Sequence, residues 1–275
     1  MKQSSDNHMI PMTSFSSGNG KGIAEDVYYY TNQIVNVIML GKPDGDWFLI
    51  DCGMPKCGEE IIEAAENRFG KGKPPKAIFL THGHFDHVGG IVKILEQWPV
   101  PVYAHELELP FLTGKQSYPE PDSTVEGGIL AKFSALYPNE PIDITGHVTA
   151  YPPDGSLPEL SDWRWIHTPG HAPGQVAFFR EKDRILIAGD AFVTVRQDSF
   201  YKVLVQKREV HGPPRYLTTD WQAAWETVKK LRDLRPAVVI AGHGQSMKGA
   251  SLRLGLKKLA DDFDTIAIPE HGRFV

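Results

Sequence analysis

The chain has 275 residues, of which 41% are hydrophobic and 23% are charged. This composition is typical of a globular protein with a buried core and excludes intrinsic disorder over most of the chain. With 34 acidic and 29 basic residues, the formal net charge is -5, which disfavours a nucleic-acid partner because phosphate contacts need a basic surface. The two cysteines, Cys52 and Cys57, are too few for a disulfide framework or a four-cysteine zinc site.

The N-terminal segment is polar and rich in serine and glycine, and we expect residues 1–22 to form a flexible tail. It lacks the apolar run of about 7–15 residues that marks a signal peptide. No segment reaches the roughly 20 apolar residues of a membrane span. We therefore expect a cytoplasmic protein that has no membrane partner.

Beyond residue 22, apolar runs alternate with amphipathic segments of helical period. Strands are predicted in chain order over 27–40 (one or two strands), 46–52, 77–81, 101–104, 148–151, 163–167, 175–180, 184–189 and 237–241. Helices are predicted over 58–69, 88–98, 129–136, 220–234 and 247–263. For the helix over 220–234, Thr218, Thr219 and Asp220 offer N-caps, and Pro236 follows its end.

The segment from about 106 to 147 interrupts this alternation. It is rich in proline, glycine and polar residues and contains only the short predicted helix over 129–136. We interpret it as a helical insertion that forms a lid or cap rather than a domain. The whole chain, 1–275, is therefore expected to be one α/β domain in which sheets are covered by helices.

One short motif carries the strongest chemical signal. Residues 81–87 read Thr-His-Gly-His-Phe-Asp-His and directly follow a predicted buried strand. Imidazole nitrogens and carboxylate oxygens are ligands for zinc and also suit iron or manganese. Gly83 is expected to give this turn unusual backbone angles. Since sites in open α/β sheets form beyond the carboxyl ends of strands, the motif predicts a metal site there.

Three further candidate ligands lie later in the chain. His171, Asp190 and His243 each follow a predicted apolar strand, and each has small residues beside it. A single loop histidine or aspartate has little weight as evidence. Their shared position after strands favours a common site with the motif at 81–87.

With these residues in this order, the chain resembles the metallo-β-lactamase superfamily of metal-dependent hydrolases, from about residue 27 to 250. The resemblance implies a four-layer αβ/βα sandwich with a two-metal site at one edge. It implies one metal held by His82, His84 and His171, and a second held by Asp86, His87 and His243. Asp190 would bridge the two metals, and Asp51 would accept a hydrogen bond from a ligand imidazole.

The resemblance and the ligand types together predict a hydrolase. We expect two zinc ions, with iron or manganese as alternatives. Two such ions lower the pKa of bound water and polarise a substrate oxygen. The hypothesis is that a bridging hydroxide attacks the carbonyl of an ester, lactone or thioester. Asp86 would be catalytic, orienting the hydroxide and carrying a proton to the leaving group.

The substrate itself is less specified by the sequence. Phe111, Phe192 and Tyr201 are candidate contacts for a small-molecule substrate with an acyl chain or ring, and the chain is close in length to the family's lactonases. A β-lactam hydrolase and a mononuclear iron enzyme of the persulfide dioxygenase type remain alternatives, followed by a non-catalytic metal-binding scaffold. The protein is expected to be a monomer or a homodimer.

Overall fold

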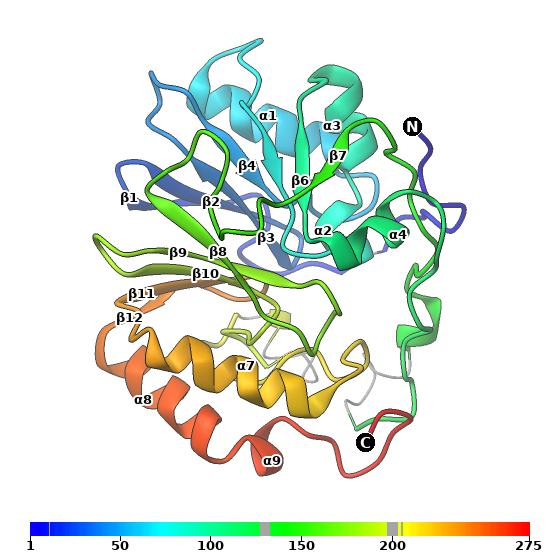
Figure 1. Cartoon of the computed structure of the whole chain (residues 1–275), viewed down its shortest axis with the longest axis vertical. Coiled ribbons are helices and arrows are strands. Elements are labelled where there is room, and N and C mark those ends of the chain that lie inside the picture. Colours follow the sequence, from blue (N-terminus) through cyan, green and yellow to red (C-terminus); the bar gives the residue numbers. More distant parts are fainter. Residues whose placement is uncertain (11, 127–132, 197–202, 205) are drawn as a thin grey trace. The chain divides into compact units, whose positions relative to one another are not determined.

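The computed structural model describes residues 1–10, 12–126, 133–196, 203–204 and 206–275, which divide into two compact units. Unit 1 comprises residues 1–118 and 138–150, and unit 2 comprises residues 119–137 and 151–275. Each unit contains one β-sheet and the helices that pack on it (Figure 1). The predicted α/β class is therefore confirmed, while the single domain over 1–275 stays a prediction.

Unit 1 contains a seven-stranded sheet in which the strands follow one another in sequence order. The first four strands are antiparallel and β4 to β7 are parallel. The strands are β1 (Gly20–Ala24), β2 (Val27–Asn32), β3 (Val35–Leu40), β4 (Phe48–Ile50), β5 (Ile78–Phe79), β6 (Val102–Ala104) and β7 (Val148–Ala150). Thus β1 begins inside the segment predicted as a tail, because it pairs with β2.

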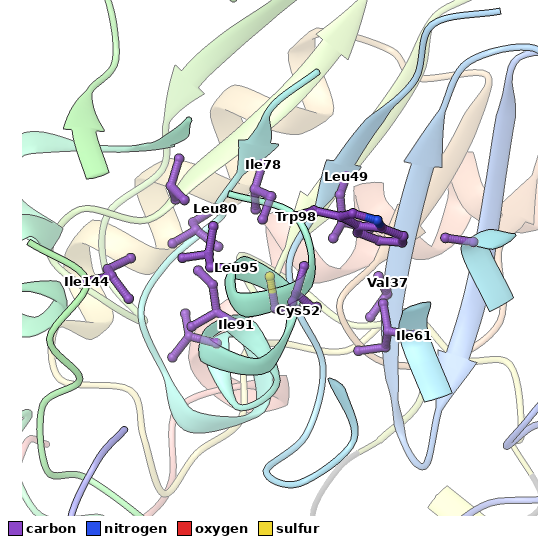
Figure 2. Packing of buried hydrophobic residues seen from close by; sticks show 14 of the residues in the cluster. Val37, Leu49, Cys52, Ile61, Ile78, Leu80, Ile91, Leu95, Trp98 and Ile144 are labelled. Atoms are coloured by element: carbon purple, nitrogen blue, oxygen red, sulfur yellow. The ribbon is translucent and has the colours of Figure 1, made fainter. Parts of the chain in front are cut away.

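Helices α1 (Gly58–Phe69) and α3 (Ile91–Gln97) pack on this sheet and form the core of unit 1. Figure 2 shows Ile61 of α1 and Ile91 of α3 in the same apolar cluster as strand residues such as Leu49. The buried residues of α1 recur with helical spacing, as the sequence pattern predicts. Trp47 is fully buried and stacks on Phe69 with ring centroids 4.4 Å apart.

The helix predicted over 88–98 is instead two helices, α2 (Phe85–Val88) and α3. Two glycines separate them. The backbone N–H of Gly89 donates to the Gly53 carbonyl at 2.9 Å, and that of Gly90 donates to the Cys52 carbonyl at 3.1 Å. A Cβ at Gly89 would lie 2.3 Å from the Pro55 nitrogen. This close approach to another loop interrupts the helix.

Unit 2 contains a five-stranded sheet in the order β12-β11-β10-β9-β8. The strands are β8 (Trp163–His167), β9 (Val176–Arg180), β10 (Ile185–Gly189), β11 (Val238–Ala241) and β12 (Met247–Lys248). Strands β10 and β11 are parallel, and the other neighbours are antiparallel. Helices α7 (Trp221–Asp233), α8 (Gly249–Asp261) and α9 (Phe263–Ile266) contribute to its core.

Two boundaries in unit 2 refine the sequence prediction. Asp220 is the N-cap of α7, and its carboxylate accepts a hydrogen bond from the Ala223 N–H at 2.9 Å. The helix predicted over 247–263 begins two residues later, because Met247 and Lys248 form the edge strand β12. Each unit thus supplies a sheet with helices, as expected for the two halves of an αβ/βα sandwich.

The predicted insertion over 106–147 contains short helical turns in its described residues. In unit 1 these are η1 (Glu106–Glu108) and α4 (Leu109–Leu112), and in unit 2 the 3-10 turn η2 (Ser134–Leu136). Residues 129–132 of the predicted helix lie outside the described residues. In the part of the chain that is described, every helix is too short or too polar to span a lipid bilayer.

Candidate metal centre

The motif at 81–87 lies at the edge of the unit 1 sheet where its parallel strands end. Strands β4 and β5 are parallel neighbours, so the residues that follow them meet at the same edge. Asp51 follows β4, and Thr81 and His82 follow β5. The topology therefore brings Asp51 to the motif although 30 residues separate it from Thr81.

Asp51 is a buried carboxylate that organises the motif. Its Oδ1 accepts from the Thr81 N–H at 2.8 Å and its Oδ2 from the Thr81 hydroxyl at 2.7 Å. Nδ1 of His87 lies 2.7 Å from the same Oδ2. Since a carboxylate accepts, Nδ1 of His87 carries the proton, and in the neutral ring Nε2 carries the lone pair. The structure thus contains the contact between Asp51 and an imidazole of the motif, while the ligand role of that imidazole stays a prediction.

The four candidate ligands of unit 1 are all buried and lie together. His82 and His87 have no exposed surface, and His84 and Asp86 are each 5% exposed. The ring centroid of His82 lies 4.7 Å from that of His84 and 4.2 Å from that of His87. Asp86 lies in the first turn of α2, and its Oδ2 is 4.0 Å from Nε2 of His87.

The loop between His82 and His84 is held by two residues whose hydrogen bonds to it the sequence does not predict. The N–H of Gly83 donates to Oε2 of Glu108 at 2.8 Å and to the Tyr118 hydroxyl at 3.0 Å. Tyr118 also donates its hydroxyl proton to Glu108 and packs against the ring of His84. This contact could not be predicted from the sequence, because 25 residues separate Gly83 from Glu108.

Gly83 is required for space rather than for its backbone angles, which corrects the sequence interpretation. It is absent from the residues with positive φ. A Cβ at this position would lie 2.9 Å from the Tyr118 hydroxyl and 3.3 Å from Oε2 of Glu108. A side chain here would push away the two groups that hold the loop.

Tyr118→Phe is expected to destabilise the protein by about 1–3 kcal/mol, because the buried Glu108 carboxylate loses a donor. Burial and the adjacent charge of Glu108 hold the pKa of Tyr118 well above its usual value, so the phenol remains a donor at neutral pH. Unfolding in urea measures the effect. Tyr28→Phe is the control, because Tyr28 is a half-buried residue of β2 and loses the same atom outside this network. Equal losses in both variants would contradict this role.

The candidate ligands of unit 2 gather at one edge of its own sheet. Strands β8, β10 and β11 run in the same direction, so His171, Asp190 and His243 all follow strands that end at that edge. Nε2 of His243 lies 3.2 Å from Oδ2 of Asp190, and Nε2 of His171 lies 3.6 Å from the same oxygen. All three residues are at most 2% exposed.

Buried polar contacts hold these three loops in place. Gln175 accepts from the Asp190 N–H at 3.3 Å and donates to the Thr168 carbonyl at 3.2 Å. Thr194 donates its N–H and its hydroxyl to the His243 carbonyl, both at 3.0 Å. The Asp190 and His243 loops are therefore fixed by backbone and side-chain hydrogen bonds within unit 2.

The three predicted substrate contacts have different positions. Phe111 stacks on Tyr118 with ring centroids 3.9 Å apart, and both line a cavity of about 20 Å³ in unit 1, which is room for about one water molecule. Phe192 is fully buried in the core of unit 2. These positions favour packing roles. Tyr201 lies outside the described residues.

The two cysteines are buried thiols. Burial, followed by the nearby charge of Asp51, raises the pKa of Cys52 well above its usual value. Burial also raises the pKa of Cys57. Both side chains therefore stay protonated at neutral pH and are poor nucleophiles.

The fold and the His/Asp donor sets together define a family. Residues 30–243 match the sequence model described as "Metallo-beta-lactamase superfamily", and the chain belongs to this superfamily. It is thus a metallo-hydrolase with a His/Asp set for divalent metal ions, as the sequence resemblance predicts.

Similar proteins agree with this assignment. The chain is 47% identical to the "Probable metallo-hydrolase YflN" of Bacillus subtilis (strain 168) over 259 residues, which are 94% of this chain and 98% of that protein. The crystal structure of the BLEG-1 B3 metallo-β-lactamase has a TM-score of 0.58 and 23% identity, and covers 84% of this chain and 94% of its own. The crystal structure of TTHA1623 in a di-iron-bound form has a TM-score of 0.53 and 26% identity over 83% of this chain and 94% of that one.

Proposed function

We propose that the two donor sets hold a pair of divalent ions, and that the protein hydrolyses a small-molecule ester, lactone or thioester. His82, His84 and His171 would hold one ion, and Asp86, His87 and His243 the other. Asp190 would contact both. Membership of the superfamily supports this assignment, because the matched region includes all seven residues.

The observation that carries the proposal is an arrangement of buried imidazole nitrogens and carboxylate oxygens. Because Asp51 accepts the Nδ1 proton of His87, the lone pair of the neutral His87 ring is on Nε2. In unit 2, Nε2 atoms of two histidines approach one carboxylate oxygen of Asp190 to 3.2 and 3.6 Å. Imidazole nitrogens and carboxylate oxygens are a donor set that fits zinc or iron.

Asp86 is the residue to which we assign proton handling. Divalent ions bound at this site would supply activation of water as a nucleophile and polarisation of a carbonyl oxygen. The carboxylate of Asp86 would orient the water and accept its proton, and would then return a proton to the leaving alkoxide or thiolate. The elevated pKa values of Cys52 and Cys57 argue against a thiol nucleophile, which supports water in this role.

Metal analysis of the purified protein, combined with a substrate panel, tests the proposal. We expect two divalent ions per chain and hydrolysis of at least one ester, lactone or thioester. Removal of the ions with a chelator should abolish turnover, and zinc should restore it. A chromogenic β-lactam belongs in the panel as the competing substrate class.

The native metal is the second question that this experiment answers. We propose zinc, while the di-iron form of the solved TTHA1623 structure, at 26% identity, favours iron as the alternative. One iron per chain with oxygen uptake on a persulfide would overturn the hydrolase proposal in favour of a dioxygenase. Two irons with ester hydrolysis would change only the metal.

A further inference from the structure

The loop that carries His171 is clamped by the segment leading into α7. The carbonyl of Gly170 accepts from the N–H groups of Thr219 at 3.3 Å and Asp220 at 3.0 Å. Further along the helix, the Thr227 hydroxyl donates to the Pro169 carbonyl at 2.8 Å. These bonds fix the backbone on the N-terminal side of His171 but do not involve its ring.

A separate contact involves the ring itself. Oγ1 of Thr218 lies 3.1 Å from Nδ1 of His171, and both residues are 1% exposed. The same hydroxyl lies 2.8 Å from the carbonyl oxygen of Pro214. A carbonyl only accepts, so the single hydroxyl proton of Thr218 is directed to Pro214. The Thr218 oxygen must then accept from His171, which places the imidazole proton on Nδ1.

This proton direction determines which nitrogen faces the carboxylate of unit 2. With the proton on Nδ1, a neutral His171 carries its lone pair on Nε2. That nitrogen is the atom 3.6 Å from Oδ2 of Asp190. The neutral ring is therefore held with an acceptor, and not a donor, toward Asp190.

We propose that Thr218 is a positioning residue that fixes His171 in the Nδ1–H tautomer and so presents Nε2 as a metal ligand. The metal part of this inference rests on the ligand role proposed for His171 above. Thr218 accepts the Nδ1 proton of His171 as Asp51 accepts that of His87, but it does so with a neutral hydroxyl in place of a carboxylate. Helix α7 thereby contributes to the site through a residue just before its start.

The test compares three variants of the full chain. Thr218→Val replaces the hydroxyl by a methyl group of similar size, whereas Thr218→Ser keeps the hydroxyl. Thr227→Val is the matched control, because it removes the other threonine hydroxyl of the same clamp without touching the ring. Long-range 1H–15N spectra of the histidines read the tautomer of His171, and competition with a chromophoric chelator reads the affinity for zinc.

We expect wild type, Thr218→Ser and Thr227→Val to keep the proton on Nδ1 of His171. Thr218→Val should shift it toward Nε2 and weaken zinc binding about 10–100-fold, the usual effect of losing the partner of a ligand histidine. An unchanged tautomer in Thr218→Val, or the same loss in Thr227→Val, would overturn the inference. A shifted tautomer with unchanged zinc affinity would instead overturn the ligand role of His171 and the metal part of the inference with it.

Discussion

Replacing Asp86 with asparagine is expected to lower turnover by about 10²–10⁴-fold, the range typical for loss of a general acid or base. Asparagine has nearly the same shape and keeps one oxygen that can contact a metal, but it can neither hold nor transfer a proton. Asp86 is 5% exposed in the first turn of α2, close to His87. We therefore expect the variant to fold and to retain part of its metal, so the loss appears in kcat.

Steady-state kinetics and elemental analysis of the same preparation check this result. Asp44→Asn is the control, because it makes the same chemical change in an exposed turn. Unchanged turnover in Asp86→Asn would exclude the proton-handling role. A complete loss of metal would show that Asp86 acts as a ligand whose charge the site requires, and kcat would then carry no information on proton transfer.

The second large effect concerns the stability of unit 2. Gly170→Ala is expected to lower the free energy of unfolding by about 3–5 kcal/mol, combining backbone strain with overlap in a packed region. Gly170 has a φ of +128°, which other residues rarely adopt. An added Cβ would lie 2.3 Å from the backbone nitrogen and 2.5 Å from the Cα of Ala224 in α7. Because those atoms belong to the helix backbone, the clamp on the His171 loop must open.

Denaturant unfolding of this variant should be compared with that of Gly249→Ala. Gly249 also has a positive φ, +69°, but a Cβ there meets nothing within 4 Å. That control measures the conformational strain alone, expected to be about 1 kcal/mol. Equal destabilisation of the two variants would show that overlap with Ala224 adds nothing to the loss of stability in Gly170→Ala.

The candidate ligands could be predicted because each lies directly after a strand that the sequence pattern predicts. The motif at 81–87 and the loops at His171, Asp190 and His243 all follow short apolar strands. Strand ends and ligand types are both visible in the sequence. The helical period of 58–69 likewise predicted α1 with its observed bounds.

The residues that support the site could not be predicted because their partners are distant. Glu108 meets Gly83 across 25 residues, and Thr218 meets His171 across 47. In the sequence Thr218 is one of three candidate caps for a helix, yet Asp220 takes that position and Thr218 contacts the ring. The break between α2 and α3 has a similar origin, since only the packed loop beside Gly89 makes a continuous helix impossible.

The division of the chain into two units has a consequence for synthesis. All residues of unit 1 precede Tyr151 in the chain, and its core is built from residues between Val37 and Ile144 together with partly buried neighbours. Since compact parts of a chain can fold in the order of their synthesis, the core of unit 1 can close before most of unit 2 has been synthesised. Residues 119–137 are then the exception, because they emerge early but belong to unit 2. The remaining residues of unit 2, 151–275, are all synthesised after them.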